Sequence, residues 1–261
     1  MPLRATNSPI SMPDILAQTL AMPGLGWIVA ITFVAGVVYG FAGFGAALVF
    51  MPVTTAFVPV EVAVAAFSVS ALASLVTVVP RAWTQADRPA TLLMIGCATL
   101  TAPFGIWVLR STDVTVMRWV LLAVVTVTLL ALMTGWRYAA VPGRKARAGV
   151  GLATGFLGGA TGLLGPIAIL FQLSGGDSVS RSRANTLVFL TITSLLLLPF
   201  MALQGILGPA AVALGLLLLI PYGLGARAGQ AMFNPAQEKL YRLCAYCIIA
   251  AAILLGLPLW D

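Results

Sequence analysis

The sequence predicts an all-α membrane protein of two inverted repeats, each made of a glycine-broken re-entrant helical hairpin followed by three transmembrane helices. Of the 261 residues, 61% are hydrophobic and only 8% are charged, and the mean hydropathy is +1.05. A soluble domain carries charge on about a quarter of its residues, so lipid must be the solvent for most of this surface. An internal duplication indicates the two repeats.

Six apolar runs reach or approach the roughly 20 residues that a transmembrane helix needs. They are Val62–Val79, Pro89–Leu109, Val114–Trp136, Ala184–Leu203, Ile206–Ala226 and Leu240–Leu257. Two further apolar regions, Trp27–Val60 and Ala148–Leu173, are each interrupted in the middle by clustered glycines. Because glycine weakens a helix interior, we expect each of these two regions to contain a break between two helices.

The two interrupted regions are copies of one another. Gly36-Val-Val-Tyr-Gly40-Phe-Ala-Gly43 aligns with Gly155-Phe-Leu-Gly-Gly159-Ala-Thr-Gly162, and Pro103-Phe-Gly105 aligns further on with Pro221-Tyr-Gly223. The chain therefore divides into four parts. They are a tail over residues 1–26, a first repeat over 27–136, a basic linker over 137–147 and a second repeat over 148–261.

The distribution of basic residues bears on how the repeats are oriented. If both broken regions crossed the membrane, there would be eight spans in parallel halves, and the Lys and Arg residues would divide evenly between the two sides. If each region instead returns to its own side, eleven of the 14 lie on one side, and only Arg4, Arg110 and Arg118 lie on the other. Basic residues gather in cytoplasmic loops, so we favour inverted repeats and keep eight parallel spans as the alternative. This arrangement makes the linker cytoplasmic and the tail, with its short amphipathic stretch, extracytoplasmic, for a protein of the cell (inner) membrane.

The breaks themselves suggest an anion site. Proline is favoured in the first turn of a helix, so one helix should end near Gly162 and another should start at Gly165-Pro166. The equivalent break in the first repeat is Gly43-Phe-Gly45-Ala46. A helix start carries unpaired N–H groups and a partial positive charge, which suit an anion. The alternative is that these glycines only allow helices to pack closely.

Neutral donors in the runs that follow the breaks could complete such a site without the cost of a buried charge. We single out Ser68, Asn185 and Thr186, among a wider set of hydroxyl groups that also includes Ser70, Ser74, Thr191, Thr193 and Ser194. Arg181 and Arg183 precede the second of these runs, where their charge would attract anions to the rim of the site.

The absence of histidine and the positions of the acidic and lysine residues argue against an enzyme, a metal protein or a nucleic-acid-binding protein. The chain has no histidine, its acidic residues fall in loops or at the ends of spans, and its lysines are loop residues. We therefore expect no enzyme activity, because a hydrolase needs a nucleophile with a base. We also expect no metal, no cofactor and no nucleic-acid partner. The expected partners are the lipid bilayer and a small anion, and a homodimer is one assembly that we keep open.

The repeated pattern G-x-x-x-G-F-x-G-x-x-G, with the duplicated Pro-[Phe/Tyr]-Gly segment and Gly223-Leu-Gly-Ala-Arg227, resembles the sulfite exporter TauE/SafE family over nearly the whole chain after residue 25. The resemblance implies a multi-pass permease for sulfite, organosulfonates or related sulfur oxyanions. It departs from the family's frequent G-x-G-G-G-x-x-x-x-P, since the first copy reads Gly43-Phe-Gly-Ala-Ala and the second has only Gly165-Pro166. The alternatives are an anion channel or a membrane subunit that transports nothing.

Overall fold

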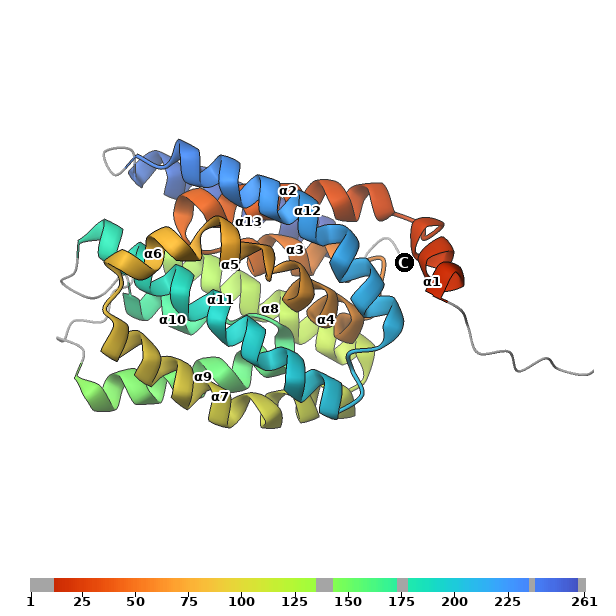
Figure 1. The fold of residues 1–261 in the computed structure, drawn as a ribbon, viewed down its shortest axis with the longest axis horizontal. Helices are drawn as coiled ribbons and strands as arrows, with labels where there is room; N and C mark the ends of the chain where they lie inside the picture. The colour runs from red at the N-terminus through yellow and green to blue at the C-terminus, as the bar shows by residue number, and fades with distance from the viewer. Residues whose placement is uncertain (1–11, 135–142, 173–177, 235–237, 258–261) are drawn as a thin grey trace, which may run out of the picture.

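The computed structural model describes residues 12–134, 143–172, 178–234 and 238–257, which form α-helices and no strand (Figure 1). The all-α class predicted from the sequence is confirmed. The helices are α1 (Met12–Leu20), α2 (Leu25–Ala42), α3 (Ala46–Thr54), α4 (Val60–Ser70), α5 (Ala73–Thr77), α6 (Val79–Gln85), α7 (Arg88–Ser111), α8 (Val114–Met133), α9 (Arg144–Thr161), α10 (Gly165–Gln172), α11 (Val179–Leu203), α12 (Pro209–Met232) and α13 (Glu238–Gly256). Most of the predicted linker, residues 137–142, lies outside the described residues, as does the start of the tail.

Six stretches among the described residues are long and apolar enough to cross a membrane. Five coincide with predicted runs, and the sixth is α2, which is uninterrupted for 18 residues because its break falls only at Gly43. The predicted run at the end of the chain forms α13, whose apolar part, Arg242–Gly256, is shorter. Numerous large apolar side chains remain exposed on the outer helices, as expected for contact with lipid.

The run predicted as Val62–Val79 is divided among α4, α5 and α6. Pro80 lies in the first turn of α6, where its missing N–H costs nothing. Its ring would clash with the carbonyl group four residues earlier in a continuous helix, so α5 ends at Thr77. A shorter interruption at Ala71-Leu72 separates α4 from α5. These interruptions bring non-helical backbone into the middle of the molecule.

The chain reverses direction between α2 and α3. Gly43 ends α2 in the left-handed conformation (φ 83°), its N–H donates to Tyr39 O, and Gly45 (φ 89°) precedes α3. A methyl group placed on Gly24, just before α2, would lie 2.2 Å from the ring of Phe57, which follows α3. The pair α2–α3 therefore begins and ends at the same end of the molecule, next to α1 (Figure 1).

The pair α9–α10 reverses in the same way but opens toward the other end of the molecule (Figure 1). At that end, Arg147 of α9 forms an ion pair with Asp87, 3.4 Å apart. Ser182 Oγ of α11 donates to the carbonyl group of Gln172, the last residue of α10. Asn185 of α11 in turn accepts from the backbone N–H of Asp87, which caps α7. The start of α9 and the end of α10 thus lie at the end where α7 and α11 begin.

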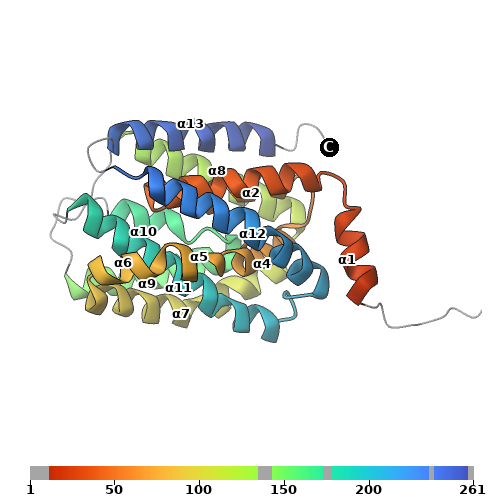
Figure 2. The same ribbon diagram turned by 45° about the horizontal axis from the view of Figure 1, so that its top comes forward.

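Each long arm of a broken pair packs against a helix of the other half of the chain. Helix α2 lies along α12 (Figure 2), and α9 lies along α7. A methyl group on Gly36 would lie 2.4 Å from the carbonyl oxygen of Tyr222, and one on Gly155 would lie 2.0 Å from that of Ala98. The glycines of the duplicated motif therefore allow backbone-to-backbone contact, as in close-packed membrane helices. Close packing is therefore one role of these glycines, and it is compatible with anion binding at the helix breaks.

Candidate functional site

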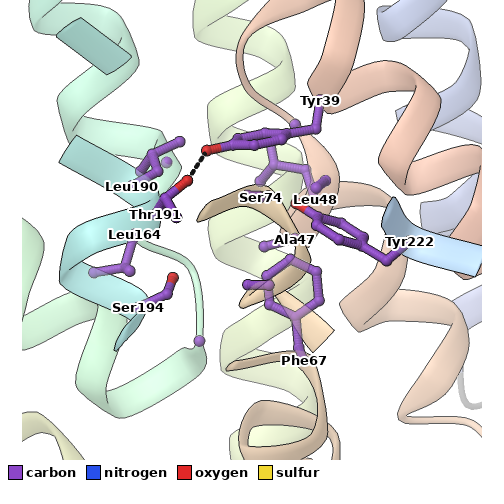
Figure 3. Close-up of a pocket in the computed structure, with 15 residues that line it drawn as sticks. Tyr39, Ala47, Leu48, Phe67, Ser74, Leu164, Leu190, Thr191, Ser194 and Tyr222 are labelled. Carbon is purple, nitrogen blue, oxygen red and sulfur yellow. Dashed lines mark hydrogen bonds between the residues drawn. The ribbon is translucent and has the colours of Figure 1, made fainter. Parts of the chain in front are cut away.

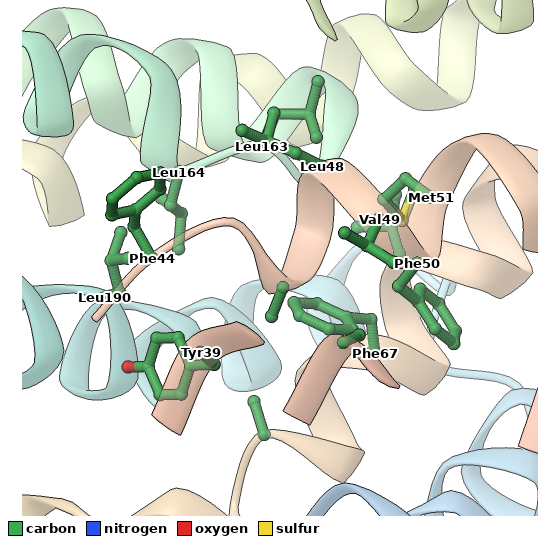
Figure 4. Packing of buried hydrophobic residues seen from close by; sticks show 14 of the residues in the cluster. Tyr39, Phe44, Leu48, Val49, Phe50, Met51, Phe67, Leu163, Leu164 and Leu190 are labelled. Carbon is green, nitrogen blue, oxygen red and sulfur yellow. The ribbon is translucent and has the colours of Figure 1, made fainter. Parts of the chain in front are cut away.

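The two helix breaks meet at a cavity in the middle of the molecule, where about 430 Å³, its open side included, is not filled by atoms (Figure 3). The first repeat contributes Gly45 and the whole first turn of α3, and the second contributes the break before α10. Helices α2, α4, α11 and α12 supply most of the remaining wall. In Figure 4, Phe44 from the first break lies beside Leu164 from the second and Leu190 of α11. Residues far apart in the sequence thus form one site.

The breaks do not offer equal numbers of backbone donors. Helix α3 starts after Gly45 without a side-chain cap, and its first residues, Ala46 and Leu48 included, line the cavity. In the second repeat, Pro166 lacks an N–H, and the N–H of Leu163 donates to Thr161 Oγ1 at 3.2 Å. Free N–H groups of a helix start attract anions, so α3 provides the stronger anion-binding end of the two.

Five polar side chains line the cavity, all of them uncharged: Tyr39, Ser74, Thr191, Ser194 and Tyr222. The Tyr39 hydroxyl donates to the carbonyl group of Leu187 (3.0 Å) and lies 2.8 Å from Thr191 Oγ1. Because its single proton is used on Leu187, the threonine hydroxyl is the donor in the second bond.

Ser74 differs from its neighbours. Its side chain is fully buried, and its Oγ has no partner that meets hydrogen-bond geometry in the described part of the chain, although it lies close enough to Tyr222 for the two to interact. A buried hydroxyl without a hydrogen bond costs free energy. Ser74 is therefore a candidate ligand group, with a donor available to a molecule in the cavity.

The aromatic rings around the cavity pack on one another. The ring centroids of Tyr39 and Tyr222 are 6.1 Å apart, and the ring of Phe67 meets Tyr222 edge-on at 5.8 Å. Such packing fixes ring positions, and with them the positions of the tyrosine hydroxyl groups. No lining residue is charged, so an anion here would be held by N–H and O–H dipoles alone.

The structure brings four of the sequence-predicted site residues to the cavity: Gly45, Ala46, Gly162 and Gly165. Three others lie elsewhere and already have partners. Ser68 Oγ donates to Val64 O (2.9 Å) and Thr186 Oγ1 to Ser182 O (2.8 Å), so both bond to their own helices. Asn185 Oδ1 accepts from the Asp87 N–H at 2.7 Å, and so ties α11 to α7. Pro166 is buried in α10 beside the cavity without lining it.

The predicted rim arginines have different surroundings. Arg181 is exposed in the first turn of α11. Arg183 donates from Nε to the carbonyl group of Phe41 (3.2 Å) and from Nη2 to that of Gly40, and its guanidinium lies 4.1 Å from the centroid of the Phe233 ring. It thereby satisfies carbonyl groups at the end of α2. Gly43 is the C-cap of this helix, and a methyl group on it would collide with the Arg183 side chain.

Sequence reasoning did not select the two tyrosines or choose Ser74, Thr191 and Ser194 over other hydroxyl residues. A signal was present for the tyrosines, because both stand inside the duplicated motifs. Tyr39 lies between Gly36 and Gly40, and Tyr222 lies between Pro221 and Gly223. A hydroxyl-bearing ring among small residues in an apolar run indicates a polar position inside the helix bundle. The hydroxyl residues could not be ranked, because helical phase is uncertain where the helices are broken.

Apolar helices long enough to span a membrane, around a cavity at paired helix breaks, define a multi-pass membrane protein of the transport class. The chain belongs to the sulfite exporter TauE/SafE family, whose family model matches residues 28–255. The family resemblance seen in the sequence is therefore confirmed, and membership in a family of membrane exporters agrees with the expectation of a protein that is not an enzyme. Comparisons with curated proteins and with solved structures found no match.

Proposed function

We propose that this protein transports a small sulfur oxyanion, sulfite or an organosulfonate, and binds it in the cavity between the two helix breaks. The observation that carries the proposal is that the uncapped first turn of α3 and the buried Ser74 hydroxyl, which has no hydrogen bond of good geometry with a described residue, face the same cavity. Both can donate to a molecule in the cavity, and the oxygen atoms of a sulfur oxyanion are hydrogen-bond acceptors. Membership in a family of sulfite exporters supports the same class of substrate.

The uncharged lining determines how tightly the cavity can hold an oxyanion. A buried arginine would hold an oxyanion tightly, whereas several N–H and O–H dipoles offset only part of the cost of removing the ion from water. A transport site must release its ion as well as take it up, so moderate affinity is suitable. Ser74 and the first turn of α3 would orient the ion, and the surrounding aromatic and leucine side chains would exclude water.

For the membrane arrangement, we propose two inverted repeats whose broken pairs α2–α3 and α9–α10 are re-entrant hairpins that enter the inner membrane from opposite sides. Support comes from the opposite ends toward which the two pairs open, and from the reciprocal packing of α2 on α12 and α9 on α7. Inverted repeats with broken helices meeting at depth are a recurring transporter design. In this arrangement the basic ends of α7, α9 and α11 face the cytoplasm, and both termini lie outside. Eight spans in parallel halves remain the alternative.

Flux measurements test the transport proposal. The purified protein is reconstituted in liposomes, and the uptake of radiolabelled sulfite is compared with that of empty liposomes. We expect saturable uptake, with Ser74→Ala lowering kcat/KM by about tenfold through loss of one hydrogen bond to a charged group. Ser70→Ala is the matched control, because Ser70 is equally buried but donates to Phe67 O (2.8 Å) and does not line the cavity.

The same measurement separates the alternatives. Uptake that rises linearly with sulfite concentration would indicate an anion channel. Uptake no faster than in empty liposomes, for sulfite and for organosulfonates alike, would indicate a membrane subunit that transports nothing.

A further inference from the structure

A second cavity lies beside the first, at the end of the molecule where α2 ends and α11 begins. Its unfilled space is about 600 Å³, its open side included, and its wall contains Arg81 of α6 and Arg183 of α11, with the neutral polar residues Gln85, Ser180 and Gln230. Among the described residues, no acidic side chain lines it. The described lining therefore carries two positive charges and no negative one.

The two arginines differ in their surroundings, and both have N–H groups available to bind an anion. Arg183 is held in place by its bonds to the carbonyl groups of Gly40 and Phe41 and by the Phe233 ring, yet these bonds use only two of its five N–H donors. Arg81 is exposed, and its guanidinium has no hydrogen bond or ion pair with any described residue. The two positive charges are close enough to repel each other. An anion between them would remove that repulsion and accept from both.

Successive turns of α11 line this cavity and the central one. Leu187 lines the second cavity, whereas Tyr39 and Thr191 line the first. The Tyr39 hydroxyl donates to Leu187 O and is also hydrogen-bonded to Thr191 (the latter bond is drawn in Figure 3), so this hydrogen-bonded group connects residues that line the two cavities. An ion that moved from the second cavity to the helix breaks along α11 would pass this hydrogen-bonded group.

We propose that Arg81 and Arg183 form a second anion site, which captures the transported oxyanion before it reaches the central cavity. It is here called the outer site because it lies outside the central cavity, at the end of the molecule that we assign to the cytoplasm. The assignment of its ligand as a sulfur oxyanion rests on the proposed function, but the site itself rests on its own lining. The outer site is charged and partly exposed, so its affinity falls with ionic strength, whereas the central cavity is uncharged and depends on salt much less.

Equilibrium binding of radiolabelled sulfite to the purified full-length protein tests the proposal. We expect two sulfite ions per chain at low ionic strength, one of them lost as salt is added. Arg81→Gln should raise the dissociation constant of the salt-sensitive site by about tenfold or more, as expected when a hydrogen bond to a charged group is removed. Arg88→Gln is the matched control, because it removes the same charge at the start of α7, near the same end of the molecule. Arg88 stacks on Trp83 and does not line the cavity.

The outcomes distinguish the outer site from the proposed function. Identical sulfite binding by the wild type, Arg81→Gln and Arg88→Gln overturns the outer site. If Ser74→Ala then binds one sulfite ion fewer than the wild type, the central site is still supported. If Arg81→Gln loses one bound sulfite ion and Ser74→Ala loses none, the outer site is supported and the central site is overturned. Equal losses in Arg81→Gln and Arg88→Gln indicate general attraction by surface charge and overturn the outer site. No sulfite binding to the wild type overturns both proposals.

Discussion

The hydroxyl group of Tyr39 lies 2.8 Å from Thr191 Oγ1, so a residue of the first helix pair is hydrogen-bonded to α11 in the second half of the chain. Both residues are buried, and the same tyrosine also donates to the carbonyl group of Leu187. This link lies between the charged cavity and the uncharged one. It therefore joins the two halves of the fold beside residues that line both cavities.

Tyr39→Phe should destabilise the protein by about 1 kcal/mol, because it removes the hydrogen-bond partner of the buried Thr191 hydroxyl. Thermal unfolding in detergent measures the loss. A double-mutant cycle with Thr191→Val provides the control, since the two changes should couple by at least about 0.5 kcal/mol if the hydrogen bond is the cause. Strictly additive effects would show that the bond contributes nothing to stability.

Close helix packing predicts opposite effects for two glycines of the same helix. Gly155→Ala places a methyl group 2.0 Å from the carbonyl oxygen of Ala98, so α9 and α7 must move apart at a cost of about 1–3 kcal/mol or more. Gly149→Ala meets nothing within 4 Å, and alanine's higher helix propensity should leave stability unchanged or raise it by up to about 1 kcal/mol. Unfolding of both variants, compared with the wild type, checks the difference. Equal stabilities would contradict the packing of α7 on α9.

Two glycines at the second break should respond differently to substitution. Gly162 has a left-handed backbone (φ 74°), and a methyl group on it would lie 3.0 Å from Val64, so Gly162→Ala should lower stability. Gly165 has no such conformation, and its new methyl group would meet only the flexible end of Ile169 at 3.0 Å. Gly165→Ala should therefore fold normally while obstructing the approach of an anion to the cavity.

Stabilisation by sulfite provides the measurement for this pair. A ligand at a hundred times its dissociation constant stabilises a protein by about 2.7 kcal/mol. The wild type should show this shift in thermal unfolding, and Gly165→Ala should be as stable as the wild type without sulfite but gain much less from it. A full wild-type shift in Gly165→Ala would place the anion away from this break.

The sequence predicted the breaks better than it predicted their surroundings. Clustered glycines located both breaks, because their effect on a helix is local and repeats in two copies. The length of α2 was not predicted, since nothing in the local pattern shows that Gly36 and Gly40 remain helical while Gly43 does not. Their helical state depends on contact with α12, which is a tertiary effect.

The side chains of the site were harder to predict for the same reason. Ser68 and Ser74 look equivalent in the sequence, but the interruption after α4 changes the helical phase between them. Ser68 then bonds to its own helix, and Ser74 lines the cavity. Arg183 likewise could be placed near the entrance, but its bonds to the end of α2 required the fold.

Cysteine labelling can decide between inverted and parallel repeats at the second helix pair. In a background with Cys97, Cys244 and Cys247 replaced by alanine, single cysteines are placed at Arg144, where α9 starts, and at Val179, just after α10. A re-entrant α9–α10 pair puts both positions on the cytoplasmic side. Eight parallel spans put them on opposite sides. We expect a membrane-impermeant maleimide to reach neither position in intact cells and both after permeabilisation.

Phe57→Cys is the positive control for labelling from outside, because Phe57 is 41% exposed and lies at the opposite end of the molecule, beside Gly24. The positive-inside bias predicts that this position reacts in intact cells, since the basic ends of the helices lie at the other side. Reaction of Phe57→Cys without reaction of Arg144→Cys or Val179→Cys supports the inverted arrangement. If Arg144→Cys and Val179→Cys are labelled from opposite sides, α9–α10 crosses the membrane and the inverted arrangement fails.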